Sequence, residues 1–258
     1  LEDPGKMIQT GYSAGARSKP VFNWVRNVIS RQETSLEFLA SSDFRSSCLF
    51  ALGWNICRSV LPHDGVMKEW VEFLDNNRLP RMDGGVGIQS STGNVTIHLG
   101  DTPVTFHNME LAPASGLLNQ NYARGVHREQ QPHPFAVQWI LHRSHGEAAG
   151  GHFYIAEYGT VTVNAPDTLI SWRPSQWHGT GLADYSPYTD DPDYKQYGIS
   201  FVTPPRLAGV YKKYGQAFNA LHVKTPQVAF GKLWTAADEA AFEAETELLQ
   251  ALADGVEE

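Results

Sequence analysis

Four short strand-like segments between residues 135 and 201 constrain the fold of this chain more than any other feature. They are FAVQWILHR, HFYIAEYGTVTVN, DTLISWRP and YGISFVT, and each is rich in the β-branched and aromatic residues typical of strands. Turn sequences such as Gly150-Gly151 and Asn164-Ala165-Pro166-Asp167 separate them. Upstream, a Gly-, Thr- and Val-rich stretch from Asp83 to Leu111 predicts two or three more strands. The sequence therefore predicts a β core over about 83–204.

Helical patterns flank this predicted core. Residues 20–80 carry apolar residues at helix-like spacings, including an amphipathic stretch, DGVMKEWVEFLDNN, that ends before Pro80. A second helix is predicted over about 235–254, with Thr235 as N-cap. Its predicted apolar face consists of Phe242, Leu248, Leu249 and Leu252. The expected fold is α+β, with N-terminal helices, a β core and a C-terminal helix in one domain over 7–258, and residues 1–6 are interpreted as a cloning remnant.

The net charge of −8 comes from the C-terminal segment. Eight acids and no Lys or Arg lie between Asp238 and Glu258, and the remaining 20 acids balance the 20 basic residues. A neutral body neither favours nor excludes nucleic acid as a partner. Cys48 and Cys57 are too few for a disulfide framework, which favours an intracellular location, nuclear or cytoplasmic, over secretion. No apolar run approaches the roughly 18 residues of a membrane span, so no membrane partner is expected.

Two His-x-Glu pairs are candidate metal ligands, His127-Arg128-Glu129 and His145-Gly146-Glu147. Residues i and i+2 share one face of a strand, so His127 and Glu129 can point the same way. His178, at the expected end of the DTLISW strand, lies 51 positions after His127. Two imidazoles and one carboxylate form the facial triad that binds ferrous iron and leaves positions open. We favour His127, Glu129 and His178, because the second pair precedes a Gly-Gly turn. The alternative is that all three are ordinary polar residues.

The stretch 125–203 resembles the ten-eleven-translocation / J-binding-protein group of Fe(II)/2-oxoglutarate oxygenases, particularly its fungal-type members. The pattern that carries the resemblance is GVHRE…FAVQWIL…GGHFYIAEYG…APDTLISWRPSQWHGT, in about a third of the chain. The resemblance implies a double-stranded β-helix (jelly-roll) core and ferrous iron at His127, Glu129 and His178. It also implies oxidation of a C–H bond, usually in the methyl group of a modified base such as 5-methylcytosine.

Three positions depart from the pattern of that group. Glu129 stands where the group has Asp, and Pro132 stands where relatives that read cytosine have Asn. The third departure is the Arg that pairs with the far carboxylate of 2-oxoglutarate, because Gln196 occupies its place in this chain. Lys195 is the favoured substitute, and Arg206 lies beyond the strand. We expect 2-oxoglutarate as co-substrate, with ascorbate, which an algal relative uses, as the alternative.

Further residues near the triad are candidates for substrate contacts. Those expected to bind substrate are Asn121, Tyr122, Gln131, His133, Trp177 and Tyr185. Basic residues expected around the site are Arg124, Arg128, His142, Arg143 and His145. Local positive charge suits a phosphate backbone or an anionic co-substrate, so nucleic acid is a candidate partner beside the small-molecule co-substrate. Two other functions stay open, namely the same iron chemistry on a small metabolite or peptide side chain, and a barrel that binds a ligand without catalysis. The oligomeric state is left open.

Overall fold

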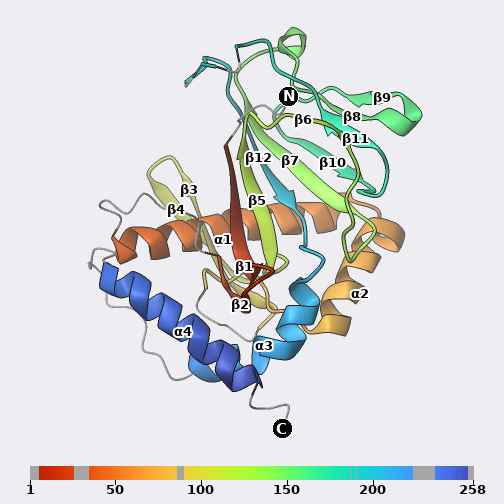
Figure 1. Cartoon of the computed structure of the whole chain (residues 1–258). Helices are drawn as coiled ribbons and strands as arrows, with labels where there is room; N and C mark the ends of the chain where they lie inside the picture. Colours follow the sequence, from red (N-terminus) through yellow and green to blue (C-terminus); the bar gives the residue numbers. More distant parts are fainter. Residues whose placement is uncertain are drawn as a thin grey trace. The chain divides into compact units, whose positions relative to one another are not determined.

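A computed structural model of the chain describes residues 6–25, 35–85, 90–186, 188–189, 191–222 and 236–254 (Figure 1). The chain divides into two compact units. The first consists of Leu1–Gln9, Cys57–Phe73 and Gly116–Pro205. The second consists of Thr10–Ile56, Leu74–Ser115 and Arg206–Glu258. The expectation of a single domain over 7–258 stays a prediction.

The larger sheet of the first unit is built from the apolar segments that the sequence marks as strands. Four strands lie in the order β10-β7-β12-β5 and pair antiparallel, and the first residues of β1 follow β5 (Figure 1). Their bounds are β10 (Thr168–Trp172), β7 (Ala136–Arg143), β12 (Gln196–Phe201), β5 (Ser115–Gln120) and β1 (Lys6–Gly15). Ile140, Ile199 and Phe201 are fully buried, and this burial stabilises the sheet.

A smaller antiparallel sheet of the first unit has the order β6-β11-β8-β9. Its strands are β6 (Arg124–His127), β11 (His178–Thr180), β8 (Phe153–Ile155) and β9 (Thr160–Thr162). Phe153 packs on Trp172 of the larger sheet, with ring centroids 5.0 Å apart. The two sheets therefore face each other across aromatic side chains. Short helical turns complete this unit, namely η1 (His63–Met67), η2 (Glu147–Ala149) and η3 (Ala156–Tyr158).

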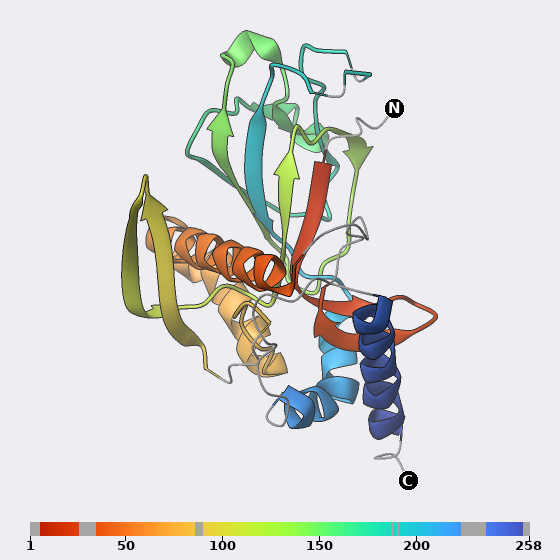
Figure 2. The same cartoon turned by 90° about the vertical axis from the view of Figure 1, so that its left-hand side faces the viewer.

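The second unit contains a long helix covered by a β-hairpin. The strands β3 (Thr92–Leu99) and β4 (Thr102–Glu110) pair antiparallel and run beside helix α1 (Leu36–Val60), as Figure 2 shows. Four buried residues join the two, and they are Cys48, Ala51, Val95 and Leu111. Helix α2 (Lys68–Asn77) begins in the first unit and ends in the second.

Aromatic packing forms the other core of the second unit. Helix α3 (Leu207–His222) lies against strand β2 (Pro20–Trp24), and helix α4 (Ala236–Asp254) lies against α3 (Figure 2). Tyr12 stacks on Phe22, with centroids 5.0 Å apart, and meets Phe218 edge-on at 5.4 Å. The Tyr12 hydroxyl donates a 2.8 Å hydrogen bond to Asp83, which satisfies the buried polar end of this ring.

The α+β class with antiparallel sheets is confirmed, and each of the four segments between residues 135 and 201 contains a strand. HFYIAEYGTVTVN, however, forms two strands, β8 and β9, separated by the turn η3. Two further segments differ in detail. The predicted helical region 20–80 is wrong at its start, because Pro20–Trp24 is strand β2. Four successive residues there, Val21 to Trp24, are buried, so the alternation that marks a strand is missing from the sequence. Two strands, β1 and β2, precede the predicted β core. Within the predicted region, the first strand begins at Thr92 rather than at residue 83.

Two helices bear on the predicted C-terminal region. Helix α3 was not predicted, although Leu207, Val210 and Tyr214 recur at helical spacing and are buried. The predicted C-terminal helix is confirmed as α4. Its predicted apolar face is wrong in part, because Leu249 is buried while Leu248 and Leu252 are 48% and 44% exposed. Thr235 and the Phe242 side chain lie outside the described residues. None of the described helices has the length and apolar character needed to span a membrane.

Candidate metal centre

Strand register brings the two predicted histidine ligands together. His127 is the last residue of β6 and His178 is the first residue of β11, and the two are directly opposite in this antiparallel pair. The expectation that one strand ends in His178 is wrong. β10 ends at Trp172, a turn follows, and His178 opens a new strand in the other sheet. Crossing to the smaller sheet is what places His178 beside His127.

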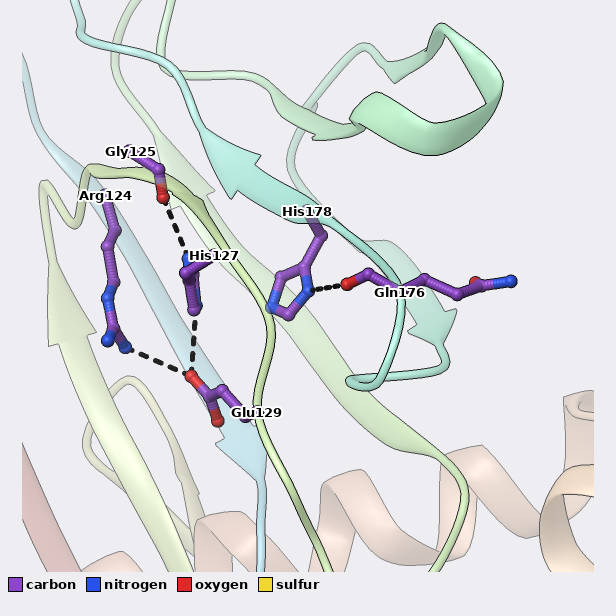
Figure 3. Close-up of polar contacts among 6 residues, drawn as sticks. All are labelled: Arg124, Gly125, His127, Glu129, Gln176 and His178. Carbon is purple, nitrogen blue, oxygen red and sulfur yellow. Dashed lines mark hydrogen bonds and ion pairs between the residues drawn. The ribbon is translucent and has the colours of Figure 1, made fainter.

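Glu129 completes a group of three converging side chains (Figure 3). One ligand atom from each of His127, Glu129 and His178 lies within 4.8 Å of the others. His127 Nε2 and Glu129 Oε1 are 3.0 Å apart. Two donors bound at right angles to a metal, at bond lengths of about 2.1 Å, are about 3.0 Å apart. The spacing of this pair therefore already suits two adjacent ligands of one ion.

The second ring nitrogen of each histidine contacts a backbone carbonyl. His127 Nδ1 lies 2.8 Å from the Gly125 oxygen, and His178 Nδ1 lies 2.8 Å from the Gln176 oxygen (Figure 3). A carbonyl only accepts, so Nδ1 must carry the proton in both rings. In His178, Nε2 of the neutral ring then presents a lone pair, which is the tautomer that binds a metal. In His127, Nε2 contacts Glu129 Oε1 at 3.0 Å, and a metal would take the place of the proton between these two atoms. Burial lowers the pKa of His178 from its usual value, which also favours the neutral ring.

The Glu129 carboxylate has its own supports. Its backbone N–H donates a 2.8 Å hydrogen bond to the Pro174 oxygen, which holds the chain just after β6. Arg124 Nη1 lies 3.1 Å from Glu129 Oε1. This contact orients the carboxylate and offsets its charge beside the two imidazoles.

Gly179, which follows His178, has a steric reason to be glycine. A Cβ at this position would lie 2.6 Å from the Tyr154 hydroxyl and 2.9 Å from the Arg124 carbonyl oxygen. β11 lies between β6 and β8, so a side chain there would push on both neighbours. The His-Gly sequence therefore lets His178 stay close to His127.

A cavity between the two sheets opens beside the three side chains. From the larger sheet and β1 it is lined by Met7, Leu117, Asn119, Gln138, Trp172 and Ser200, together with Tyr122 and Val202. From the smaller sheet side it is lined by His127, Glu129, Phe153, His178 and Thr180. A ligand in this cavity would touch the metal ligands at one end and the sheet at the other.

The predicted substrate residues are placed differently from one another. Tyr122 lines the cavity. The Asn121 side chain is hydrogen-bonded to the backbone rather than open to a substrate. Its Nδ2 donates to the Tyr194 oxygen at 2.9 Å, and its Oδ1 accepts from the Gln196 N–H at 2.8 Å. Trp177 is 45% exposed just before His178, and the Arg128 guanidinium lies 5.1 Å from its ring centroid. Tyr185 stacks on Tyr194, with centroids 5.7 Å apart.

None of the three predicted 2-oxoglutarate anchors lines the cavity. Lys195 forms an ion pair with Asp191. Gln196 is 3% exposed, and its Oε1 accepts a 2.6 Å hydrogen bond from Arg143. Arg206 belongs to the second unit, where it donates to backbone oxygens that include Ala16 at 3.3 Å.

Gln131 and His133 belong to a separate pocket that also includes Glu129. Gln131 Oε1 accepts a 3.4 Å hydrogen bond from the Thr203 N–H. His133 is 3% exposed and packs on Trp70, with ring centroids 3.6 Å apart and the ring planes tilted by 34°. Both His133 ring nitrogens have partners, the Phe135 oxygen at 2.6 Å and Thr203 Oγ1 at 3.0 Å.

The burial of His133 predicts a loss of stability in acid. Burial lowers the pKa of His133 from 6.5 to about 4. Below pH 6.5 the unfolded chain therefore binds a proton that the folded chain excludes. The free energy of unfolding should be highest above pH 6.5 and fall by about 3 kcal/mol from this residue as the pH drops to about 4. Urea unfolding of the wild type and of His133→Gln at pH 7 and pH 4.5 measures this difference. Equal pH dependence of the two proteins would contradict the prediction.

The second His-x-Glu pair does not form a comparable site. His145 is exposed and its Nδ1 lies 2.7 Å from Ser144 Oγ, while Glu147 begins the exposed turn η2. Within the described residues, His127, Glu129 and His178 are the one group of three or more His, Cys, Asp or Glu side chains close enough to share an ion. The choice between the two pairs therefore favours the first.

Several cavity residues were missed by sequence reasoning, above all Asn119, Gln138 and Ser200. Each is a polar residue within a buried strand, as in FAVQWIL and YGISFVT. A buried polar side chain needs a partner, so this interruption of an apolar run is the signal that could have found them.

Comparison of the chain with protein-family models and with curated proteins found no match.

Proposed function

We propose that this protein is an Fe(II)-dependent oxygenase whose metal is held by His127, Glu129 and His178. The observation that carries the proposal is that both histidines donate Nδ1–H to backbone carbonyls while both Nε2 atoms converge with a carboxylate. A metal-binding histidine almost always has such a partner on its other nitrogen. If the three residues were ordinary polar residues, nothing would require both Nε2 atoms to face the same carboxylate.

The proposal includes a double-stranded β-helix core. Eight strands, β5 to β12, are divided between two sheets. Four of them have the order β10-β7-β12-β5 within the six-stranded sheet, and the other four form the sheet β6-β11-β8-β9. Successive strands alternate between the two sheets except at the β8–β9 hairpin. This order supports a jelly roll, in which antiparallel strands alternate between two packed sheets.

The donor set fits ferrous iron. Two imidazoles and one carboxylate on one side leave positions for an organic chelator and for dioxygen, and bound iron would supply the activation of dioxygen. In the overall reaction one oxygen atom enters a C–H bond and the other oxidises the co-substrate. A 2-oxo acid, such as the expected 2-oxoglutarate, would leave as CO2 and the acid one carbon shorter. Ascorbate is the alternative co-substrate.

The residues of the chain orient this chemistry. Gly125 and Gln176 fix the histidine rings, and Arg124 holds the carboxylate. Phe153 and Trp172 lie 5.9 Å and 5.6 Å from the His178 ring, and both line the cavity, where they exclude water from one side of the site.

The proposed substrate is a modified nucleobase of the 5-methylcytosine type in nucleic acid. The exposed Trp177 ring beside His178, with Arg128 over it, supports this, because aromatic rings stack on unpaired bases and arginine pairs with phosphate. A small metabolite or a peptide side chain remains the second candidate for the same chemistry.

Anaerobic titration with Fe(II) tests the proposal. We expect one Fe(II) per chain, and a weak visible charge-transfer band when a 2-oxo acid chelates the bound metal. Absence of stoichiometric iron binding would contradict the oxygenase proposal and favour a fold that binds a ligand without catalysis. Iron binding without a band for any 2-oxo acid would direct the search to ascorbate.

The same preparation tests the substrate. Iron-loaded protein is mixed with a short 5-methylcytosine oligonucleotide, dioxygen and co-substrate, and the bases are analysed by mass spectrometry. A gain of one oxygen atom on the methylated base supports a nucleobase substrate. Salt-independent, negligible binding of the oligonucleotide would favour the small-molecule alternative.

A further inference from the structure

Three neutral polar side chains share one face of the larger sheet inside the cavity. Ser200 of β12 is directly opposite Gln138 of β7. Asn119 of β5 is opposite Gly198, two residues before Ser200, and therefore lies on the same face. We call Asn119, Gln138 and Ser200 the amide patch. Each is at most 9% exposed, and all three line the cavity that contains the metal ligands.

The amide patch has unused hydrogen-bonding groups. Asn119 Nδ2 makes only a long contact to Ser200 Oγ, at 3.5 Å. Gln138 is 7% exposed, and its side-chain amide has no hydrogen-bond partner within the described part of the chain. Trp172, which lines the cavity beside His178, also has a buried Nε1–H that lacks an acceptor. Side-chain amides as little exposed as those of Asn119 and Gln138 are normally hydrogen-bonded, so the patch points to a ligand with polar atoms against this sheet.

The part of a ligand that contacts the amide patch would meet no positively charged side chain. Among the described residues that line the cavity there is no Lys or Arg. The nearby bases are engaged elsewhere, since Arg124 contacts Glu129 at the metal end, Lys195 pairs with Asp191, and Arg143 donates to Tyr194 and Gln196. A carboxylate buried against neutral donors loses more hydration than those donors return, while an ester, amide or hydroxyl loses much less.

We propose that the amide patch binds the far end of the co-substrate, and that this end is uncharged. The co-substrate is then an oxygen chelator of iron with a neutral, hydrogen-bonding tail, rather than a dicarboxylate such as 2-oxoglutarate. Both a 2-oxo acid with a neutral tail and an enediol with a hydroxyl tail meet this description. The inference rests on the proposed metal site and names the co-substrate class for it.

A matched pair of ligands tests the proposal. Calorimetry on the anaerobic Fe(II)-loaded protein compares 2-oxoglutarate with its 5-methyl ester, which lacks the charge of the far end and carries one more methyl group there. The ester is expected to bind about tenfold more tightly. Equal or weaker binding of the ester overturns the proposal. Ascorbate is titrated in parallel, and its binding would identify an enediol with a hydroxyl tail as the co-substrate class.

Two variants locate the contact. Gln138→Met keeps the length of the side chain and removes its amide, so it should weaken the ester about fivefold and leave 2-oxopentanoate, which has no polar tail, unchanged. Lys195→Met is the matched control and should change neither ligand. A large loss of 2-oxoglutarate binding in Lys195→Met would instead make Lys195 the anchor and overturn the proposal. Circular dichroism and Fe(II) affinity confirm that both variants are folded.

Failure of this inference differs from failure of the proposed function. If the protein binds no Fe(II), the metal site itself is wrong. If it binds Fe(II) and prefers 2-oxoglutarate to the ester, the metal site stands and only the neutral tail is wrong.

Discussion

Replacing His178 with alanine is expected to weaken Fe(II) binding about a thousandfold, which corresponds to about 4 kcal/mol of binding free energy. The variant loses one of three protein ligands, and no other histidine, cysteine or carboxylate among the described residues joins His127 and Glu129 within reach of one ion. Loss of a residue that only supports a ligand typically costs 10- to 100-fold, so loss of a ligand itself should exceed that range. Anaerobic calorimetry with Fe(II) measures the effect.

Two further variants keep this prediction independent of folding. His178 is buried, so its removal also perturbs packing, whereas the Glu129 side chain is 37% exposed. Glu129→Gln preserves size and removes the charge, and it should weaken Fe(II) binding at least about a hundredfold without loss of stability. His145→Ala, in the rejected His-x-Glu pair, should bind Fe(II) like the wild type. Loss of iron binding in His145→Ala together with retention in Glu129→Gln would move the site to the second pair.

The metal ligands were accessible to sequence reasoning because their chemistry and spacing are both local signals. A two-residue spacing marks His127 and Glu129, and turn-rich segments between them and His178 allow the strands to return. The register was not accessible. Sequence does not say that β11 starts anew at His178 or that it pairs with β6, because pairing depends on which sheet each strand enters.

The predicted co-substrate anchor, Lys195, is one residue away from the side of β12 that faces the cavity. Gln196, Gly198 and Ser200 have the same parity along β12, and Ser200 lines the cavity. Lys195 has the opposite parity and pairs with Asp191 outside the cavity. A charge one residue away from the expected anchor is therefore on the other side of the strand. A basic residue near the expected position is therefore no evidence of an anchor unless it lies on the side of the strand that faces the cavity.

Burial of charge was also hidden from the sequence. The sequence places Arg143 with the basic residues expected around the site. Arg124 contacts Glu129 and Arg128 lies over Trp177 beside the site, whereas Arg143 does neither. Arg143 is 7% exposed at the end of β7. Its position follows from the long-range return of β12 to β7, which no local pattern records.

Replacing Arg143 with methionine is expected to lower the free energy of unfolding by about 4 kcal/mol. Its guanidinium donates to the oxygens of His145, Gly146 and Gly150, at 2.8, 3.0 and 2.6 Å. It also donates to the Tyr194 hydroxyl at 2.7 Å and to Gln196 Oε1 at 2.6 Å. Methionine fills the space but leaves these five contacts unmade, several of them buried, and the removed desolvation of the arginine offsets only part of that loss.

Urea unfolding measures the change, and two variants separate its causes. Arg143→Lys keeps the charge but has no planar fork, so it should recover less than half of the lost stability, because an ammonium group cannot reach five acceptors on different sides. Arg173→Met is the matched control, since Arg173 is exposed and its guanidinium lies 4.6 Å from the Phe135 ring centroid. It should cost less than about 1 kcal/mol. If Arg143→Met were as stable as Arg173→Met, the five hydrogen bonds would do no more than balance the cost of burying the charge, and the turn from Gly146 to Gly150 would be held by its backbone alone.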